Sequence, residues 1–102
     1  MIRVIATIEV TAGRRDDFLR VFQALVPTVR AEAGCLEYGP LVDLPTTIAA
    51  QIPVRADVVT IVEAWQDLPA LEAHLRAPHM AEYRAQIKNL VRKVTLQVLQ
   101  PA

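Results

Sequence analysis

Residues 61–80 read Ile-Val-Glu-Ala-Trp-Gln-Asp-Leu-Pro-Ala-Leu-Glu-Ala-His-Leu-Arg-Ala-Pro-His-Met. The stretch begins as a strand that ends at Glu63 and Trp65, and it continues as a helix that Asp67 caps and Pro78 interrupts. It contains the only tryptophan of the chain and both of its histidines. The scarce chemical groups of this protein are therefore predicted to gather where one strand passes into one helix.

The strand of this stretch starts at Asp57 and is rich in valine, isoleucine and threonine. Its period of two places one set of side chains on a single face: Val59, Ile61, Glu63 and Trp65. Three further extended segments are predicted at residues 2–10, from residue 35 to residue 38, and at 94–100.

Helical spacing of apolar residues separates these strands. A helix of about 18 residues is predicted after Gly13, with Asp16 and Asp17 in its first turn, and Gly34 follows its end as a left-handed cap. The helix capped by Asp67 is expected to turn three leucines inward. A second helical piece over 79–91 is expected to turn four more residues inward. These two sets are Leu68, Leu71 and Leu75, then Met80, Tyr83, Ile87 and Leu90.

The predicted order is β-α-β-β-α-β, which is the α+β, ferredoxin-like arrangement of one antiparallel sheet with two helices on one face. At 102 residues the chain is expected to form a single domain over 1–102. The strands at 2–10 and 57–65 carry apolar residues on both sides, and no third helix is predicted to cover the second face. We therefore expect a homodimer in which two sheets pack together.

Between the second and third strands, residues 39–56 keep no regular period and contain three prolines. An irregular segment of this length is unusual in a compact domain. Two interpretations remain open for it: a lid over a pocket, or a plain insertion at the edge of the sheet.

Composition argues against several classes of function. Eleven basic and eleven acidic residues cancel, so no nucleic-acid partner is expected. No apolar run is long enough for a membrane span, and no signal peptide is recognisable, so a cytoplasmic protein is expected. The only cysteine, Cys35, cannot form an internal disulfide and is expected to be a buried packing residue. No glycine-rich nucleotide loop and no metal-binding motif is present, so no cofactor and no metal are expected. A flavin held without such a loop stays open as an alternative.

Three segments resemble the antibiotic biosynthesis monooxygenase family of dimeric α/β barrels: residues 30–38 (Arg-Ala-Glu-Ala-Gly-Cys-Leu-Glu-Tyr), residues 63–67, and residues 70–74 with 78–80. The resemblance implies a cofactor-independent monooxygenase that acts on a quinol or a related electron-rich aromatic with dioxygen. It also leaves open an isomerase of a small carbonyl metabolite, or a non-enzymatic dimer that binds a small molecule. Haem degradation, known in other relatives, is disfavoured because His74 and Arg84 stand where those relatives have tryptophan and histidine.

Such an oxygenase needs a base that removes a proton from the substrate, and a histidine that is neutral near pH 7 suits this role. His74 and His79 are the two candidates for the catalytic base. Each could instead be a capping or dimer-contact residue.

Four residues are candidates for substrate binding: Trp65, Tyr38, Tyr83 and Glu63. The indole could stack on an aromatic ring, and the two hydroxyls could hold a phenolate-like intermediate; all three rings could equally be core. Glu63 could orient a histidine, although an ion pair with a partner subunit is the favoured interpretation.

Overall fold

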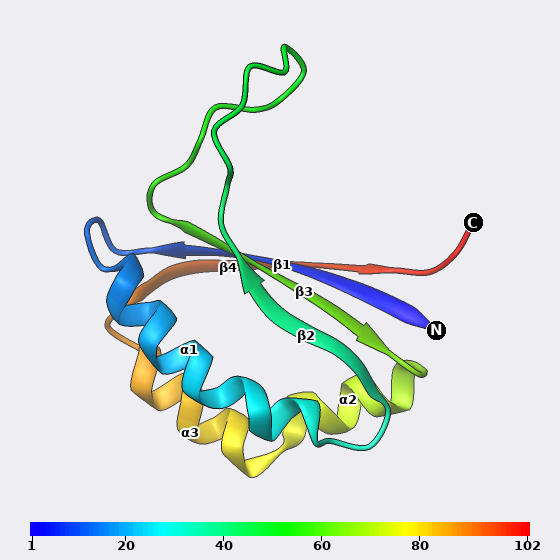
Figure 1. Ribbon diagram of the computed structural model, residues 1–102. Coiled ribbons are helices and arrows are strands. Elements are labelled where there is room, and N and C mark those ends of the chain that lie inside the picture. The colour runs from blue at the N-terminus through cyan, green and yellow to red at the C-terminus, as the bar shows by residue number, and fades with distance from the viewer.

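The computed structural model describes residues 1–102 and consists of a four-stranded sheet with three helices on one face (Figure 1). In chain order the elements are β1 (Ile2–Val10), α1 (Arg15–Arg30), β2 (Cys35–Leu41), β3 (Val58–Trp65), α2 (Leu68–Arg76), α3 (Pro78–Ile87) and β4 (Val91–Leu99). The strands pair antiparallel in the order β2-β3-β1-β4, and the sheet is open at both edges. The predicted ferredoxin-like fold is confirmed, with the second helical region divided into two helices. None of these helices is both long and apolar enough to cross a membrane.

The core lies between the inner face of the sheet and the helices. Alternate residues of β1 are buried in one cluster with residues of α1, and a row of aromatic rings continues from α1 toward β2. Phe22 stacks on Tyr38 with ring centroids 5.3 Å apart, and it meets Tyr83 of α3 edge-on at 5.9 Å. Such ring pairs stabilise a core beyond the area they bury.

Several element ends differ from the sequence-based expectation. β2 continues to Leu41 and includes Pro40, which an edge strand tolerates because one of its sides forms no ladder. α3 ends at Ile87 and β4 begins at Val91. Leu90 is still buried, but it lies in a turn whose carbonyl accepts a hydrogen bond from the backbone of Thr11 after β1.

The buried side of α2 also differs from the expected leucine stripe. Leu71 is buried, whereas Leu68 and Leu75 are exposed, and the second buried side chain of the helix is His74. The spacing of three between Leu71 and His74 places them on one face. The sequence-based prediction placed only apolar residues on the buried side of this helix. His74 can be buried there because its ring nitrogen Nδ1 hydrogen-bonds to the carboxylate of Glu32.

The two predicted helix caps, Asp67 at the start of α2 and Gly34 after the end of α1, are confirmed. Asp67 accepts a hydrogen bond from the backbone of Ala70 at 3.0 Å, and Gly34 has a positive φ of 81°. A Cβ on Gly34 would lie 2.7 Å from the Cβ of Ala70, so the end of α1 and the start of α2 touch through a residue without a side chain. The carbonyl of Gly34 also accepts a hydrogen bond from Gln66 at 2.8 Å.

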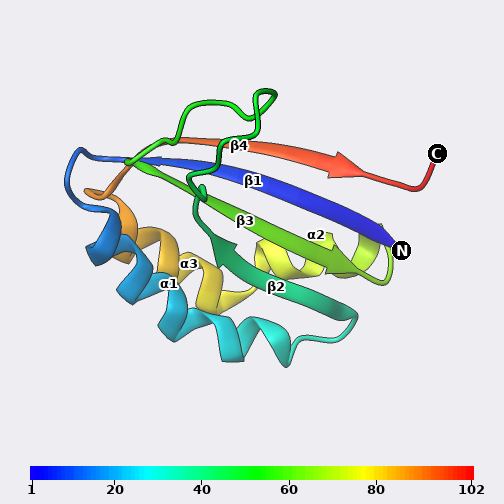
Figure 2. The same cartoon turned by 45° about the horizontal axis from the view of Figure 1, so that its top comes forward.

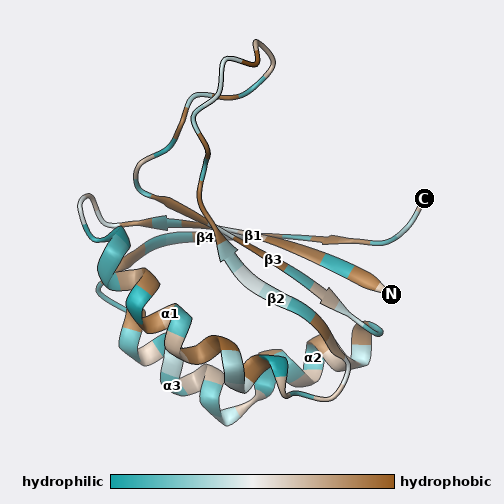
Figure 3. Ribbon diagram, viewed as in Figure 1, coloured by the Kyte–Doolittle hydropathy of each residue, from teal (hydrophilic) through white to brown (hydrophobic).

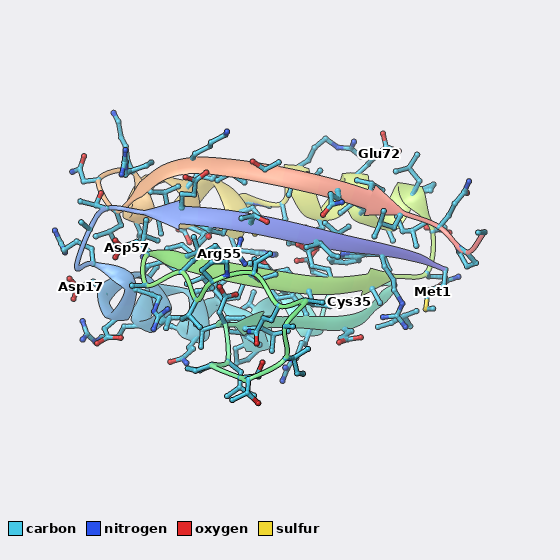
Figure 4. The ribbon with its side chains drawn as sticks, turned by 90° about the horizontal axis from the view of Figure 1, so that it is seen from above. Met1, Asp17, Cys35, Arg55, Asp57 and Glu72 are labelled. Atoms are coloured by element: carbon cyan, nitrogen blue, oxygen red, sulfur yellow. The ribbon has the colours of Figure 1, made fainter.

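The long connection between β2 and β3 covers residues 42–57 and projects from the sheet on the side opposite the helices (Figure 1). Its base is fastened by Asp43, whose carboxylate binds Arg55 through two side-chain contacts of 2.8 and 2.9 Å. Figure 4 looks onto this face of the sheet and shows Arg55 at the base of the loop. Because the loop points away from the helices, it is not a lid over a cavity of its own chain, and that interpretation was wrong.

Apolar residues remain uncovered along β4. Val94, Leu96 and Val98 are 51%, 46% and 52% exposed, although they pair with buried residues of β1 and so belong to the helix-facing side. Figure 2 shows β4 at the edge of the sheet, and Figure 3 shows hydrophobic residues continuing along the strands. The helices therefore leave one side of the inner face open.

Candidate active site

The two histidines of the chain meet at one carboxylate. Oε2 of Glu32 lies 2.9 Å from Nδ1 of His74 and 2.8 Å from Nε2 of His79. His74 is on α2, His79 is in the first turn of α3, and Glu32 is in the turn after α1. The side chains of the three residues are 2%, 15% and 26% exposed in the order His74, Glu32, His79. We call this group the His-Glu-His triad.

Local structure explains why the triad forms. Pro78 opens α3 and holds Ala77 in an extended conformation (φ −63°, ψ 142°), so the chain turns between the two histidines. The close contact of Gly34 with α2 brings the preceding turn, which carries Glu32, against the same helix. The triad thus depends on two helix ends and one glycine.

A cavity of about 310 Å³ lies between the sheet and the helices next to this triad. Its walls are mostly aliphatic and aromatic, and they include four of the predicted site residues: Tyr38, Glu63, His74 and Tyr83. Val94 and Leu96 of the exposed β4 also line it, so the cavity opens on that side. Its size and apolar lining are typical of a small-molecule site.

Four polar atoms of residues that line this cavity have no hydrogen-bond partner in the chain. No fully buried side-chain nitrogen or oxygen lacks a hydrogen bond. Yet Nε2 of His74, Oε2 of Glu63 and the hydroxyls of Tyr38 and Tyr83 form none, so each must be reachable by water. All four residues line the cavity. They offer a bound molecule hydrogen-bonding groups inside an otherwise apolar space.

The electrostatics favour a neutral imidazole at the cavity wall. Burial lowers the pKa of His74 below its usual 6.5, and the hydrogen bond to Glu32 opposes this lowering. If Nδ1–H donates to the carboxylate, the tautomer leaves a lone pair on Nε2 toward the cavity. Burial also raises the pKa of Tyr38 and of Tyr83, so both hydroxyls keep their protons. A histidine base beside two hydroxyl donors is an arrangement that can remove a proton and hold the resulting anion.

Trp65 and Glu63 form a second polar contact on the same strand face. The indole Nε1–H donates to Oε1 of Glu63 at 2.9 Å, and both residues are buried. Burial raises the pKa of Glu63, the indole hydrogen bond opposes this, and the charge of Glu32 adds to the rise. Within the chain the Glu63 side chain forms no hydrogen bond to a histidine and no ion pair; the expected pair with a partner subunit stays a prediction.

Trp65 and His79 do not line the cavity. The indole is fully buried and lies against His74, with ring centroids 4.7 Å apart. The indole therefore packs against the imidazole without lining the cavity. His79 lies on the outer side of Glu32 and borders a separate hollow between α1 and α3.

The sequence did not single out Glu32, because it lies 42 residues before His74. The sequence-based argument against a metal assumed that no carboxylate lies near the histidines. The structure shows that Glu32 contacts both. Both nitrogens, however, lie at hydrogen-bond distance from one oxygen, so the contacts describe a hydrogen-bonded triad. The only advance signal was the place of Glu32 in the 30–38 segment of the family resemblance.

Cys35 is half-buried at the start of β2, not fully buried as expected. Burial raises the pKa of its thiol, and the charges of Glu32 and Glu63 add to this rise. A reactive thiolate needs the opposite shift. Cys35 is therefore a poor nucleophile.

Comparison with known proteins identifies the family. The family model described as antibiotic biosynthesis monooxygenase matches residues 1–86. The chain belongs to this family. It is 37% identical over 103 residues to the "Probable quinol monooxygenase YgiN" of Escherichia coli K12, an alignment that spans 99% of this chain and 98% of the relative.

Solved structures share the fold of this chain. PA3566 from Pseudomonas aeruginosa is 29% identical with a TM-score of 0.81, over 99% of this chain and 93% of that one. Rv0793 from Mycobacterium tuberculosis is 27% identical with a TM-score of 0.79, over 99% and 94% of the two chains. The fold shared with these two structures therefore extends over nearly the whole chain.

Proposed function

We propose that this protein is a cofactor-independent monooxygenase of a quinol or a related electron-rich aromatic ring. The observation that carries the proposal is the apolar cavity lined by His74, whose Nδ1 contacts a carboxylate and whose Nε2 has no partner in the chain. Family membership supports oxygenation, and the printed name of the Escherichia coli relative supports a quinol as the substrate class.

In the proposed reaction His74 takes the proton of a substrate hydroxyl at Nε2. The resulting anion is electron-rich and transfers an electron to dioxygen, and the two radicals combine to form a carbon–oxygen bond. Cleavage of the oxygen–oxygen bond then releases water and leaves a hydroxyquinone, so one quinol and one dioxygen give one hydroxyquinone and one water. The hydroxyls of Tyr38 and Tyr83 hold the anion by hydrogen bonds, since both retain their protons.

The test is oxygen uptake by the purified protein with menadiol as the quinol. We expect enzyme-dependent uptake and one labelled atom in the hydroxyquinone when ¹⁸O₂ is supplied. Uptake that yields unlabelled quinone and hydrogen peroxide would show a simple oxidase and would contradict the proposal. No uptake with any quinol would favour the isomerase or the binding-protein alternative.

A further inference from the structure

The His-Glu-His triad has two imidazoles but only one carboxylate. Oε2 of Glu32 is within 2.9 Å of both, so the two rings share one negative charge. Nearly all of His74 is buried, whereas His79 is 26% exposed and borders a surface hollow. A single carboxylate balances a single imidazolium, and two cations at this spacing would repel each other.

We propose that Glu32 and His79 are positioning residues that set the charge of His74, with the carboxylate balancing one imidazolium at a time. His79 holds the charge before the reaction, and His74 holds it after taking the proton of the substrate. The inference rests on the proposed function, because it assumes that His74 is the base.

The protons balance in each direction. When Nε2 of His74 accepts the substrate proton, His79 releases its Nδ1 proton to water and continues to donate Nε2–H to Glu32. The triad then has the same net charge as before. When His74 returns its proton to the reduced oxygen, His79 takes one from water. Protons thus pass to and from water through the more exposed His79, although the base His74 is buried.

Other charged or titratable groups face the triad from the packed elements, and they do not replace Glu32. Arg84 of α3 donates to the carbonyl of Leu75 at 2.7 Å, and its cation disfavours a charged His74. Tyr38 of β2 meets His74 edge-on with ring centroids 5.4 Å apart. Three more groups lie around the two hollows that adjoin the triad: Glu63 of β3, and Glu82 and Tyr83 of α3. Among these, no carboxylate contacts either imidazole.

The experiment follows the two imidazole signals by ¹H–¹³C NMR as the pH is lowered, without substrate. Only two histidines are present, so each signal can be assigned and followed separately. In the native chain we expect His79 to take up its proton first and His74 to follow at lower pH. The native titration alone is decisive, because protonation of His74 before His79 would overturn the proposal.

Two substitutions sharpen the test. His79→Gln keeps an N–H donor for Glu32 but no charge, so the midpoint of His74 should rise by about one pH unit, or tenfold in proton affinity. His79→Lys keeps a cation, so the midpoint should stay near the native value. Glu72→Gln, which removes one charge from the exposed side of α2, is the control and should change nothing.

A structural role of His79 would give a different result. Both substitutions would then move the midpoint of His74 equally, or neither would, and the proposal would fail. Because the titration uses no substrate, it is independent of oxygen uptake. A coupled titration without oxygen uptake would contradict the proposed function alone, whereas uptake with uncoupled histidines would contradict the charge-sharing alone.

Discussion

His74 is buried, yet it keeps one nitrogen for the cavity, and the proposed reaction depends on its being neutral. Since burial lowers its pKa below 6.5, the neutral form persists to lower pH than for a free histidine. We expect kcat/KM for quinol oxidation to fall as the pH is lowered, with a midpoint below the usual histidine pKa of 6.5. A midpoint above 6.5 would contradict this assignment of the base.

Removing the imidazole tests the same residue directly. His74→Phe keeps a ring of similar size against Trp65 but no base, so kcat should fall by about 10² to 10⁴. Oxygen-uptake kinetics measure this loss, and circular dichroism confirms that the variant is folded. Glu72→Gln, on the exposed side of α2, is the matched control and should keep the native activity.

Trp65 is predicted to matter through its hydrogen bond as well as its packing. Trp65→Phe leaves Oε1 of Glu63 buried without a donor, and the free energy of unfolding should fall by about 1–3 kcal/mol from this loss alone. Urea denaturation measures the difference. Tyr83→Phe is the control, because its hydroxyl has no partner in the chain, and it should cost less. Equal losses would mean that the indole hydrogen bond contributes nothing.

At the scale of elements, two glycines with positive φ offer a matched pair. Gly13 (φ 76°) has open space around its Cβ position, whereas a Cβ on Gly34 would overlap Ala70. Both Gly→Ala substitutions should cost about 1–2 kcal/mol for the left-handed backbone. Gly34→Ala should lose about 1–3 kcal/mol more from the overlap. Urea denaturation of both variants gives this difference, and a difference near zero would mean that the end of α1 and α2 can separate freely.

The sequence predicted most elements because their signals are local. The alternation of β3, the cap at Asp67 and the break at Pro78 each act over a few residues. The inner side of α2 was not predicted, because a buried histidine is satisfied only by Glu32, which reaches it through tertiary contact. The direction of the 42–57 loop was equally hidden, since no local pattern says to which side of a sheet a connection turns. The two histidines stood out in the sequence because they are the only ones, whereas their shared partner Glu32 did not.

At the scale of the whole molecule, the open sheet face and the exposed β4 support the predicted homodimer. Ile5 and Val62 pair across β1 and β3 on the outer face, where no helix covers them. We expect a dimer at micromolar concentration by light scattering. Val62→Asp should shift the mass to that of a monomer, because an unpaired charge at a packed interface is costly. The control Gln23→Asp, on the exposed side of α1, should stay dimeric. A monomeric native chain would disprove the dimer.

The clasp between Asp43 and Arg55 separates the outer part of the 42–57 loop from the body of the protein. Leu44, Ile48 and Ile52 in this part are among the most exposed hydrophobic residues of the chain, and none of them lines the cavity. Foreign sequence grafted between residues 44 and 54 should therefore leave the cavity of its own chain unchanged, provided the clasp is kept. The loop projects from the sheet face that the predicted homodimer covers, so such a graft should shift the mass measured by light scattering toward that of a monomer.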